Sequence, residues 1–333
     1  MPRARKETVM SVIGQENTEA DRKLPSLTSE YVARWESRAS VRTRPRKTID
    51  FTQEGFFFPE DKQPLLLADE VASLDRAGKD EILVQSFYKY LHDIVNLEIK
   101  EIVSACSKIL YADLPVEFSA ETKLNTHSVI IDEYYHVYIA QDMILQLRNH
   151  YPHLKTIDHP ISDSQRAVVE IKKKLDPKYH DIFEILANCC FETTLVRELV
   201  EFFNSPGVHP SIKYYVNDHM NDESRHYAFF YDLMTYLWAE IPEDYREAIG
   251  THLAEFTTLY LSVESEKLFN IELLDSVVGD RQQARKSVEA LYAGFEITPD
   301  VPIVKNVLRA LGNAGMLGHP AVRDSFARIG WTV

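Results

Sequence analysis

The stretch His219-Met220-Asn221-Asp222-Glu223-Ser224-Arg225-His226 decides the fold class of this chain. It lies inside a helical pattern of apolar residues that runs from Ile212 to Leu237. At helical spacing, His219, Glu223 and His226 fall on the same face as those apolar residues. Burying a carboxylate beside two imidazoles is costly unless a counter-charge is present, and a divalent cation compensates all three side chains. The stretch therefore predicts a buried helix that binds metal.

A second Asp-Glu-x-x-His sequence lies upstream, as Asp132-Glu133-Tyr134-Tyr135-His136. Here too the acid and the imidazole share a face with apolar residues, among them Val129 and Ile144. One copy alone is weak evidence, because Glu and His three residues apart recur by chance on solvated helix faces. Two copies on two buried faces favour a metal site that two helices share.

Two further long helices are each predicted to supply one inward-facing glutamate. In the helix predicted over residues 80–110, Glu98 lies in the apolar row, whereas Glu101 lies beside polar residues. In the helix predicted over residues 177–204, Glu192 is the one charge in an apolar row. Both rows predict a carboxylate that points into the core.

Together these four helices match a known scheme for binding two metal ions. A four-helix bundle encloses two metals when two helices each supply one Glu and the other two each supply Glu-x-x-His. Four carboxylates balance the charge of two divalent cations, and neutral imidazoles complete the coordination shells. The predicted ligands are Glu98, Glu133, His136, Glu192, His219, Glu223 and His226.

Strand signals are few, so the predicted fold class is all-α, a four-helix bundle core with additional helices. Asp80 is the predicted cap of the first long helix. We predict a mobile N-terminal arm over residues 1–50, with a short helix over 29–41, and a single helical domain over 51–333. Further helices are predicted over 119–151, 163–175, 210–237, 244–278, 281–294, 304–317 and 319–329, and residues 51–64 as an extended segment packed on the bundle.

Composition excludes several classes of function. The formal net charge of −14 argues against nucleic acid as a partner. The basic cluster Arg42, Arg44, Arg46 and Lys47 is either an anion patch or, as we favour, part of an arm on the acidic body of its own or a partner subunit. Three cysteines favour a reducing cytoplasm. We expect neither a membrane span nor a signal peptide, because the sequence has no sufficiently long apolar run.

On these residues the chain resembles the ferritin-like di-iron carboxylate proteins, and within them the arylamine N-oxygenases. The resemblance covers about residues 80–240, and Asp222-Glu223-Ser224-Arg225-His226 is typical of the superfamily's Asp-Glu-x-Arg-His form. His219 departs from the superfamily's usual four carboxylates and two histidines, and a third histidine at this place is a feature of the arylamine N-oxygenases. The resemblance implies a p-aminobenzoate N-oxygenase of the kind found in aureothin-type antibiotic biosynthesis.

Such an enzyme uses O2 to oxidise an aromatic amine through hydroxylamine to a nitro group. The resemblance implies two iron ions, with manganese as the alternative. It also implies that Glu133 and Glu223 bridge the metals, that Glu98 and Glu192 are terminal, and that His136 and His226 bind different metals. The sequence has no flavin or nicotinamide fingerprint, so we expect a separate electron donor. We further expect a homodimer.

Other residues are candidates for supporting roles. Asp132 and Asp222 are expected to accept hydrogen bonds from the ligating imidazoles, and Arg225 to neutralise one of them; ordinary surface charge is the alternative for the aspartates. The predicted substrate pocket comprises Tyr90, Phe191 and Arg197, with Lys305 and Arg309 as further partners for a substrate carboxylate.

Three alternative functions stay open on the sequence alone. The first is a di-iron hydroxylase or radical-generating oxidase that acts on another class of substrate. The second is a ferroxidase or metal-storage protein, which would take up far more than two irons per chain. The third is a helical interaction protein with a relict site, which would bind no iron tightly.

Overall fold

The structure is a computed structural model, and it describes residues 31–194 and 202–333. Within these ranges the chain is helical and forms no β-strand; the one isolated β-bridge joins Phe56 and Val208. The all-α prediction is therefore confirmed. No helix among the described residues combines the length and the apolar character needed to cross a membrane.

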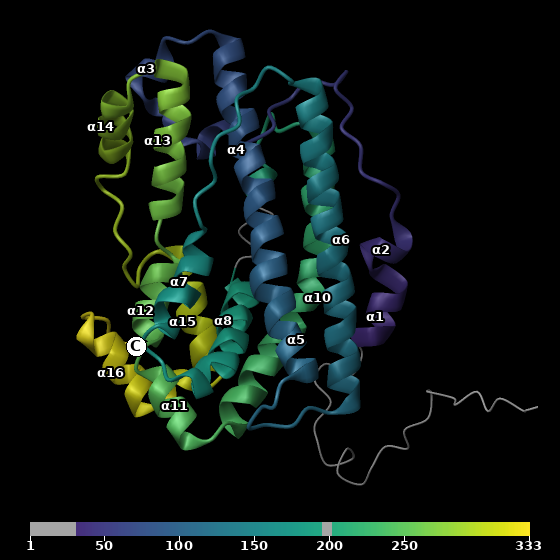
Figure 1. Cartoon of the computed structure of the whole chain (residues 1–333), viewed down its shortest axis with the longest axis vertical. Coiled ribbons are helices and arrows are strands. Elements are labelled where there is room, and N and C mark those ends of the chain that lie inside the picture. The colour runs from purple at the N-terminus through teal and green to yellow at the C-terminus, as the bar shows by residue number, and fades with distance from the viewer. Residues whose placement is uncertain (1–30, 195–201) are drawn as a thin grey trace, which may run out of the picture.

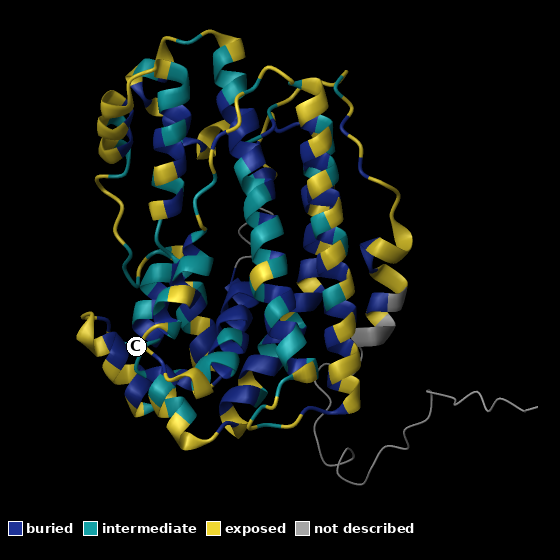
Figure 2. Ribbon diagram, in the orientation of Figure 1, coloured by how far each residue is buried: buried dark blue, intermediate teal, exposed yellow. Residues whose placement is uncertain are grey.

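Four long helical segments form the ferritin-like core (Figure 1). The first runs from α4 (Arg76–Leu97) through η4 (Glu98–Ile102) into α5 (Val103–Tyr111), and the others are α6 (Ala120–His150), α8 (His180–Thr194) and α10 (Pro210–Glu240). α4 packs on α6, α5 packs on α6 and α8, and α10 packs on α8 and α6. Figure 2 shows buried residues along these facing surfaces.

Local capping explains where the core helices begin. The Ser119 hydroxyl accepts the backbone N–H of Thr122 at 3.1 Å, which starts α6. α4 starts earlier than predicted, because the Asp75 carboxylate accepts the backbone N–H of Gly78 at 2.9 Å. Asp80 instead accepts a hydrogen bond from Arg76 at 2.8 Å. The prediction that Asp80 caps this helix is therefore wrong.

The first core helix contains a π-helical turn that begins at Glu98. The backbone N–H of Val103 donates to the carbonyl oxygen of Glu98, five residues earlier rather than four. One extra residue in the turn rotates the helix after it relative to the helix before it. Glu98 and Ile102, at the two ends of this turn, are both buried.

Apart from α1 and α2, described below, the remaining helices cover one side of the core (Figure 1). They are α3 (Asp69–Ala72), α7 (Asp163–Lys172), α11 (Glu243–Gly250), α12 (Leu253–Tyr260), α13 (Glu264–Val278), α14 (Arg281–Leu291), α15 (Pro302–Asn313) and α16 (Pro320–Arg328), with 3-10 turns η2 (Glu60–Lys62), η3 (Pro64–Leu67), η5 (Pro177–Tyr179) and η6 (Met316–Gly318). α12 packs on α7, and α15 packs on α8. α13 and α14 pair with each other beside the start of α4 (Figure 1).

The single helix predicted over residues 244–278 is instead three helices, α11, α12 and α13. A distant carboxylate explains the second break. Asp163 accepts the Ser262 hydroxyl at 2.7 Å and the Ser265 backbone N–H at 3.0 Å. These contacts satisfy backbone and hydroxyl donors at the start of α13, so the chain turns there. Nothing in the local sequence indicates a partner so far away in the chain.

The part of the N-terminal region that the structure describes lies against the bundle. α1 (Tyr31–Arg38) and α2 (Ser40–Thr43) both pack on α6 and α10. Farther along, the backbone of Phe56 bonds to Gly207 and His209, each at 2.8 Å. Residues 31–50 thus contact the bundle, although the sequence assigned them to a mobile arm. Residues 1–30 of that arm lie outside the described residues.

Candidate metal centre

The seven predicted ligands come together inside the four-helix core. They come from four segments, with Glu98 at the π-helical turn, Glu133 and His136 on α6, Glu192 on α8, and His219, Glu223 and His226 on α10. None of the seven residues is more than 6% exposed. Helix spacing alone placed them on inward faces, and the structure adds that these faces meet at one level of the bundle.

The first group of potential ligands comprises Glu98, His136, His219 and Glu223. Nε2 of His219 lies 3.1 Å from Oε1 of Glu98 and 2.9 Å from Oε1 of Glu223. Nδ1 of His136 lies 3.3 Å from the same Glu223 oxygen. The four donor atoms lie within 4.8 Å of one another, so one cation between them would contact two carboxylates and two imidazoles.

The second group comprises Glu133, Glu192, Glu223 and His226. Nδ1 of His226 lies 2.9 Å from Oε1 of Glu133 and 3.2 Å from Oε2 of Glu223. Oε2 of Glu192 lies farther away, at 3.9 Å from the same nitrogen. Glu223 belongs to both groups, and its two oxygens point to different histidines.

Several atoms at this site that could bind a metal are buried without a hydrogen-bond partner. Among the described residues, Oε2 of Glu98, Oε2 of Glu192 and Nδ1 of His219 have none. Buried polar atoms are nearly always satisfied, and leaving one unpaired costs about 1–3 kcal/mol. Oxygen and imidazole nitrogen atoms are the donors that divalent iron or manganese binds. The residues present therefore fit a pair of metal ions.

The pKa shifts of the predicted ligands indicate that positive charge is favoured at the site. Burial raises the pKa of Glu98 to about 7, although a hydrogen bond from His219 opposes this shift. Burial and the nearby Glu223 also raise the pKa of Glu192. Burial lowers the pKa of His136, but hydrogen bonds to Asp222 and Glu133 outweigh it and hold the pKa well above its usual value. Without metal, protons supply the counter-charge.

The two aspartates of the Asp-Glu-x-x-His sequences support the histidines across the bundle. Oδ2 of Asp222, on α10, lies 3.2 Å from Nε2 of His136, on α6. Oδ2 of Asp132, on α6, lies 3.4 Å from Nε2 of His226, on α10. Each aspartate thus pairs with the histidine of the opposite helix and leaves that ring's Nδ1 facing the glutamates.

Arg225 joins these two aspartates. Its guanidinium donates to Asp132 at 3.3 Å and also to Asp222. Burial raises the pKa of Asp222, but His136 and the guanidinium of Arg225 outweigh this effect and hold the pKa of that carboxyl well below its usual range. The sequence suggested that Arg225 neutralises one acid; the structure brings it to both.

The sequence did not identify two supporting contacts from the N-terminal region. The indole N–H of Trp35 donates to Oδ1 of Asp132 at 2.8 Å. The backbone N–H of Ser40 donates to Asp222 at 3.2 Å. No local signal in residues 31–40 predicts either contact, because both partners lie far away in the chain.

The predicted pocket residues lie in different places. The buried hydroxyl of Tyr90 has no hydrogen-bond partner among the described residues, and the charges of Glu98 and Glu223 add to burial in raising its pKa. Phe191 packs against Phe256 and Tyr260 on α12. Arg197 lies outside the described residues.

The two further cations proposed as partners of a substrate carboxylate are exposed and contact other residues. Lys305 is exposed on α15 and pairs with Asp300 at 3.3 Å. Arg309 is also exposed and donates to Asn306 at 3.4 Å. Neither side chain is in contact with the predicted ligands in the structure.

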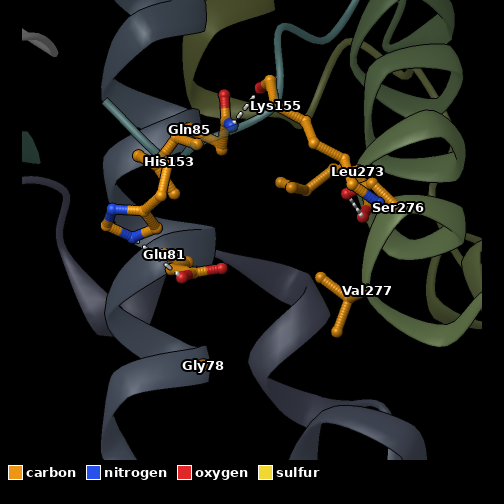
Figure 3. Close-up of a pocket in the computed structure, with 9 residues that line it drawn as sticks. Gly78, Glu81, Gln85, His153, Lys155, Leu273, Ser276 and Val277 are labelled. Carbon is orange, nitrogen blue, oxygen red and sulfur yellow. Dashed lines mark hydrogen bonds and ion pairs between the residues drawn. The ribbon is translucent and has the colours of Figure 1, made fainter. Parts of the chain in front are cut away.

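One of the cavities that lie away from the metal ligands is drawn in Figure 3. It has a volume of about 270 Å³ and lies between the start of α4, α13 and the loop at residues 153–155. The Gln85 amide donates to the carbonyl oxygen of Lys155 at 2.7 Å, and His153 lies 3.3 Å from Glu81 at its edge. None of its lining residues belongs to the predicted site.

Comparison with known proteins agrees with this geometry. The family model of the p-aminobenzoate N-oxygenase AurF matches residues 33–289, which include all seven predicted ligands. A search of the curated proteins found no significant match. The match covers most of the chain and confirms the resemblance seen in the sequence. The chain belongs to the AurF family of p-aminobenzoate N-oxygenases and is accordingly an oxidoreductase.

Proposed function

We propose that this protein is a di-iron N-oxygenase that uses O2 to oxidise the amino group of a p-aminobenzoate-like aromatic amine through hydroxylamine to nitro. The observation that carries the proposal is the pair of buried ligand groups that share Glu223, in a chain of the AurF family. No observation specifically favours the alternative roles in metal storage or protein interaction.

The proposed ligand roles follow from which oxygen faces which histidine. Glu223 presents Oε1 to His136 at 3.3 Å and Oε2 to His226 at 3.2 Å. Glu133 does the same, with Oε2 at 3.3 Å from His136 and Oε1 at 2.9 Å from His226. A carboxylate whose two oxygens face two metal positions would bridge the bound ions, so we propose Glu133 and Glu223 as the bridging ligands.

The terminal ligands are assigned by the same reasoning. Oε1 of Glu98 lies 3.1 Å from His219 and 3.8 Å from His136, both in the first group, and Oε2 of Glu192 lies 3.9 Å from His226, in the second. His219 lies in the first group, so a metal there would have two imidazoles and a metal in the second group would have one. Iron is proposed from the family, and manganese is the alternative for the same set of donors.

The bound ions would supply the oxygen chemistry, and the chain's own residues set its conditions. Asp132 and Asp222 would hold the proton on Nε2 of His226 and His136, so that the lone pair of each Nδ1 faces the glutamates and the metal position between them. Arg225 offsets the charge of both aspartates. Because the ligands are at most 6% exposed, the site excludes most bulk water, which would protect a reactive oxidant from side reactions.

The electron balance of the proposed reaction requires an outside reductant. In the first step, one amine, one O2, two electrons and two protons give one hydroxylamine and one water. Over the whole sequence, one amine, two O2, two electrons and two protons give one nitro group and two waters. The two electrons come from the separate donor that we propose.

We place the aromatic ring of the substrate at the Glu98 end of the site. Two buried hydroxyls there, of Tyr90 and Tyr215, have no hydrogen-bond partner among the described residues. The Tyr90 ring lies 4.6 Å from Phe203 and 5.9 Å from Phe87. Aromatic walls with a few polar atoms are typical of small-molecule sites. Arg197 stays a proposed partner of the substrate carboxylate.

We also propose that the protein forms a homodimer through the outer face of α6. Large apolar side chains are exposed there at helical spacing, at Leu124, Ile131, Tyr134, Tyr138 and Leu145. A contiguous exposed apolar stripe is typical of a surface that a partner covers.

Sedimentation equilibrium tests the proposed homodimer. It is expected to give twice the chain mass, and a monomer mass at micromolar concentration would contradict the proposal.

The decisive assay of function starts from anaerobically reduced, iron-loaded protein. After exposure to O2 with a panel of aromatic amines, mass spectrometry is expected to find hydroxylamine or nitro products, because the site is built for O2 chemistry on a bound amine. Aromatic compounds without an amino group serve as the control. Hydroxylation of the ring with no nitrogen oxidation would instead support the alternative di-iron hydroxylase.

Glu98→Ala and Glu101→Ala form a matched pair for metal binding. Glu98 faces the ligand group, whereas Glu101 lies near Glu184 and Lys172 on another face. We expect about two irons per chain in the wild type and in Glu101→Ala, and fewer in Glu98→Ala, by elemental analysis after desalting. Full loading of Glu98→Ala together with loss in Glu101→Ala would show that the helix phase is misassigned.

His219→Ala tests the residue that distinguishes this family from other di-iron proteins. The substitution removes one imidazole from the first group, so the iron absorption spectrum is expected to shift and amine oxidation to fall sharply. The fold should survive, because one truncation on a long helix costs a few kcal/mol at most. Circular dichroism provides the folding control. Wild-type spectrum and turnover in this variant would remove His219 from the ligand set.

A further inference from the structure

A hydrogen-bonded chain connects one proposed ligand to the surface of the protein. His226 bonds through Nε2 to Oδ2 of Asp132 at 3.4 Å, and the other oxygen of Asp132 accepts the Trp35 indole N–H at 2.8 Å. Trp35 is 8% exposed, so its ring lies just below the surface. Two hydrogen bonds therefore connect a large aromatic ring just below the surface to the imidazole of a buried ligand.

The surface over Trp35 is basic although the whole protein is acidic. Between Arg34 and Lys47 the sequence holds six basic residues and one acidic residue, in a chain with a formal net charge of −14. We define the basic patch as Arg34, Arg38 and Arg42, which are exposed on α1 and α2. The guanidinium of Arg42 lies over the Trp35 ring, 5.6 Å from its centroid.

The other basic residues of this segment hold it in place. Arg44 pairs with Asp218 at 2.9 Å, and Lys47 pairs with the same carboxylate. Arg46 donates to both oxygens of Asp142, at 2.8 and 2.6 Å. These pairs fix α1 and α2 against α6 and α10, so Trp35 and the basic patch keep a constant position relative to His226.

A hollow next to the basic patch leads toward the same network. It has a volume of about 360 Å³ and lies between α1, α2 and α10. Arg38 and Arg44 line it from the N-terminal helices, and Arg225 lines it from α10. Arg225 is the residue that joins Asp132 and Asp222. A negatively charged group that entered this hollow would meet three guanidinium groups.

The proposed N-oxygenation needs two electrons from outside, and the ligands are too deeply buried for another protein to touch. We propose that an acidic one-electron carrier protein docks on the basic patch and that its electrons reach the metal site through Trp35, Asp132 and His226. Two reduced carriers are oxidised by one electron each for the two electrons that the reaction consumes. This inference rests on the proposed function.

Electrostatics favour this face for such a partner. An acidic carrier is repelled by most of an acidic protein and attracted by an isolated basic patch, which steers the encounter toward it. Because exposed charges are screened at an ionic strength near 0.15 M, the association should weaken as salt is raised. The route also leaves the Glu98 end of the site to the substrate, away from the histidine that receives the electrons.

The test of docking uses a reduced acidic [2Fe–2S] ferredoxin and iron-loaded protein. The triple variant Arg34→Glu, Arg38→Glu, Arg42→Glu is expected to weaken the ferredoxin Kd at low salt by roughly tenfold or more, measured by calorimetry. The matched control, Arg285→Glu, Lys286→Glu, Arg323→Glu, makes the same change in net charge on exposed residues of α14 and α16 and should bind like the wild type. Equal Kd values for both variants, or no binding to the wild type, would overturn the docking surface.

The test of the electron route uses Trp35→Phe, which keeps a ring but removes the indole N–H. At saturating ferredoxin, stopped-flow oxidation of the ferredoxin is expected to be slower in this variant, while its Kd and iron content match the wild type. A purely structural role for Trp35 would change iron content or Kd instead. An unchanged oxidation rate would overturn the route.

A separate measurement distinguishes failure of this inference from failure of the proposed function. Exhaustive reduction by dithionite bypasses the carrier, so one cycle with O2 and an aromatic amine then reports the chemistry alone. If the wild type forms no nitrogen-oxidised product under these conditions, the proposed function is wrong. If it forms product but the ferredoxin results fail as described above, only the docking surface or the route is wrong.

Discussion

Negative charge concentrated inside a helical bundle is the constraint on which the rest of this structure depends. Four glutamates and two aspartates lie buried at one level of the core, and within residues 31–194 and 202–333 the guanidinium of Arg225 pairs with both aspartates. Carboxylates in such surroundings must bind protons or cations. The raised pKa values of Glu98 and Glu192 show the proton-bound solution. Two divalent cations would balance the four glutamates without those protons, so the same buried charge links the fold to the candidate metal centre.

The pairing of aspartates with histidines across the bundle ties its two Asp-Glu-x-x-His helices together. Asp132 supports the histidine of α10, and Asp222 supports the histidine of α6. An error in the relative height of α6 and α10 would break both contacts, so the network fixes that height. The N-terminal region adds one donor to each aspartate, from Trp35 and from Ser40. A segment that the sequence marked as peripheral therefore contributes to the centre.

Helical periodicity made the helices and the faces that carry the ligands predictable. Features that depend on contacts between distant parts of the chain could not be predicted in this way. The inward positions of Glu98, Glu133 and Glu192 follow from counting along one helix at a time. Counting cannot show the break before α13, because the carboxylate that stabilises it, Asp163, lies about a hundred residues earlier. Nor can it show Trp35 bound to Asp132, or Asp75 rather than Asp80 capping α4. In each case the sequence offers several residues of the same chemical type, and only the folded structure shows which of them makes the contact.

The π-helical turn at residues 98–102 changes which residues of the first core helix face the core before and after it. Its extra residue offsets the helical phase by about 100°, so α4 and α5 present differently numbered faces to the core although they form one continuous rod. α5 can therefore turn to contact α8 as well as α6, while α4 contacts α6. Removing one residue from this turn would restore an ordinary α-helix and rotate one half against the other. In chains of this family, a one-residue length difference here would reorganise half of the bundle interior, whereas the same difference in a surface loop would change little.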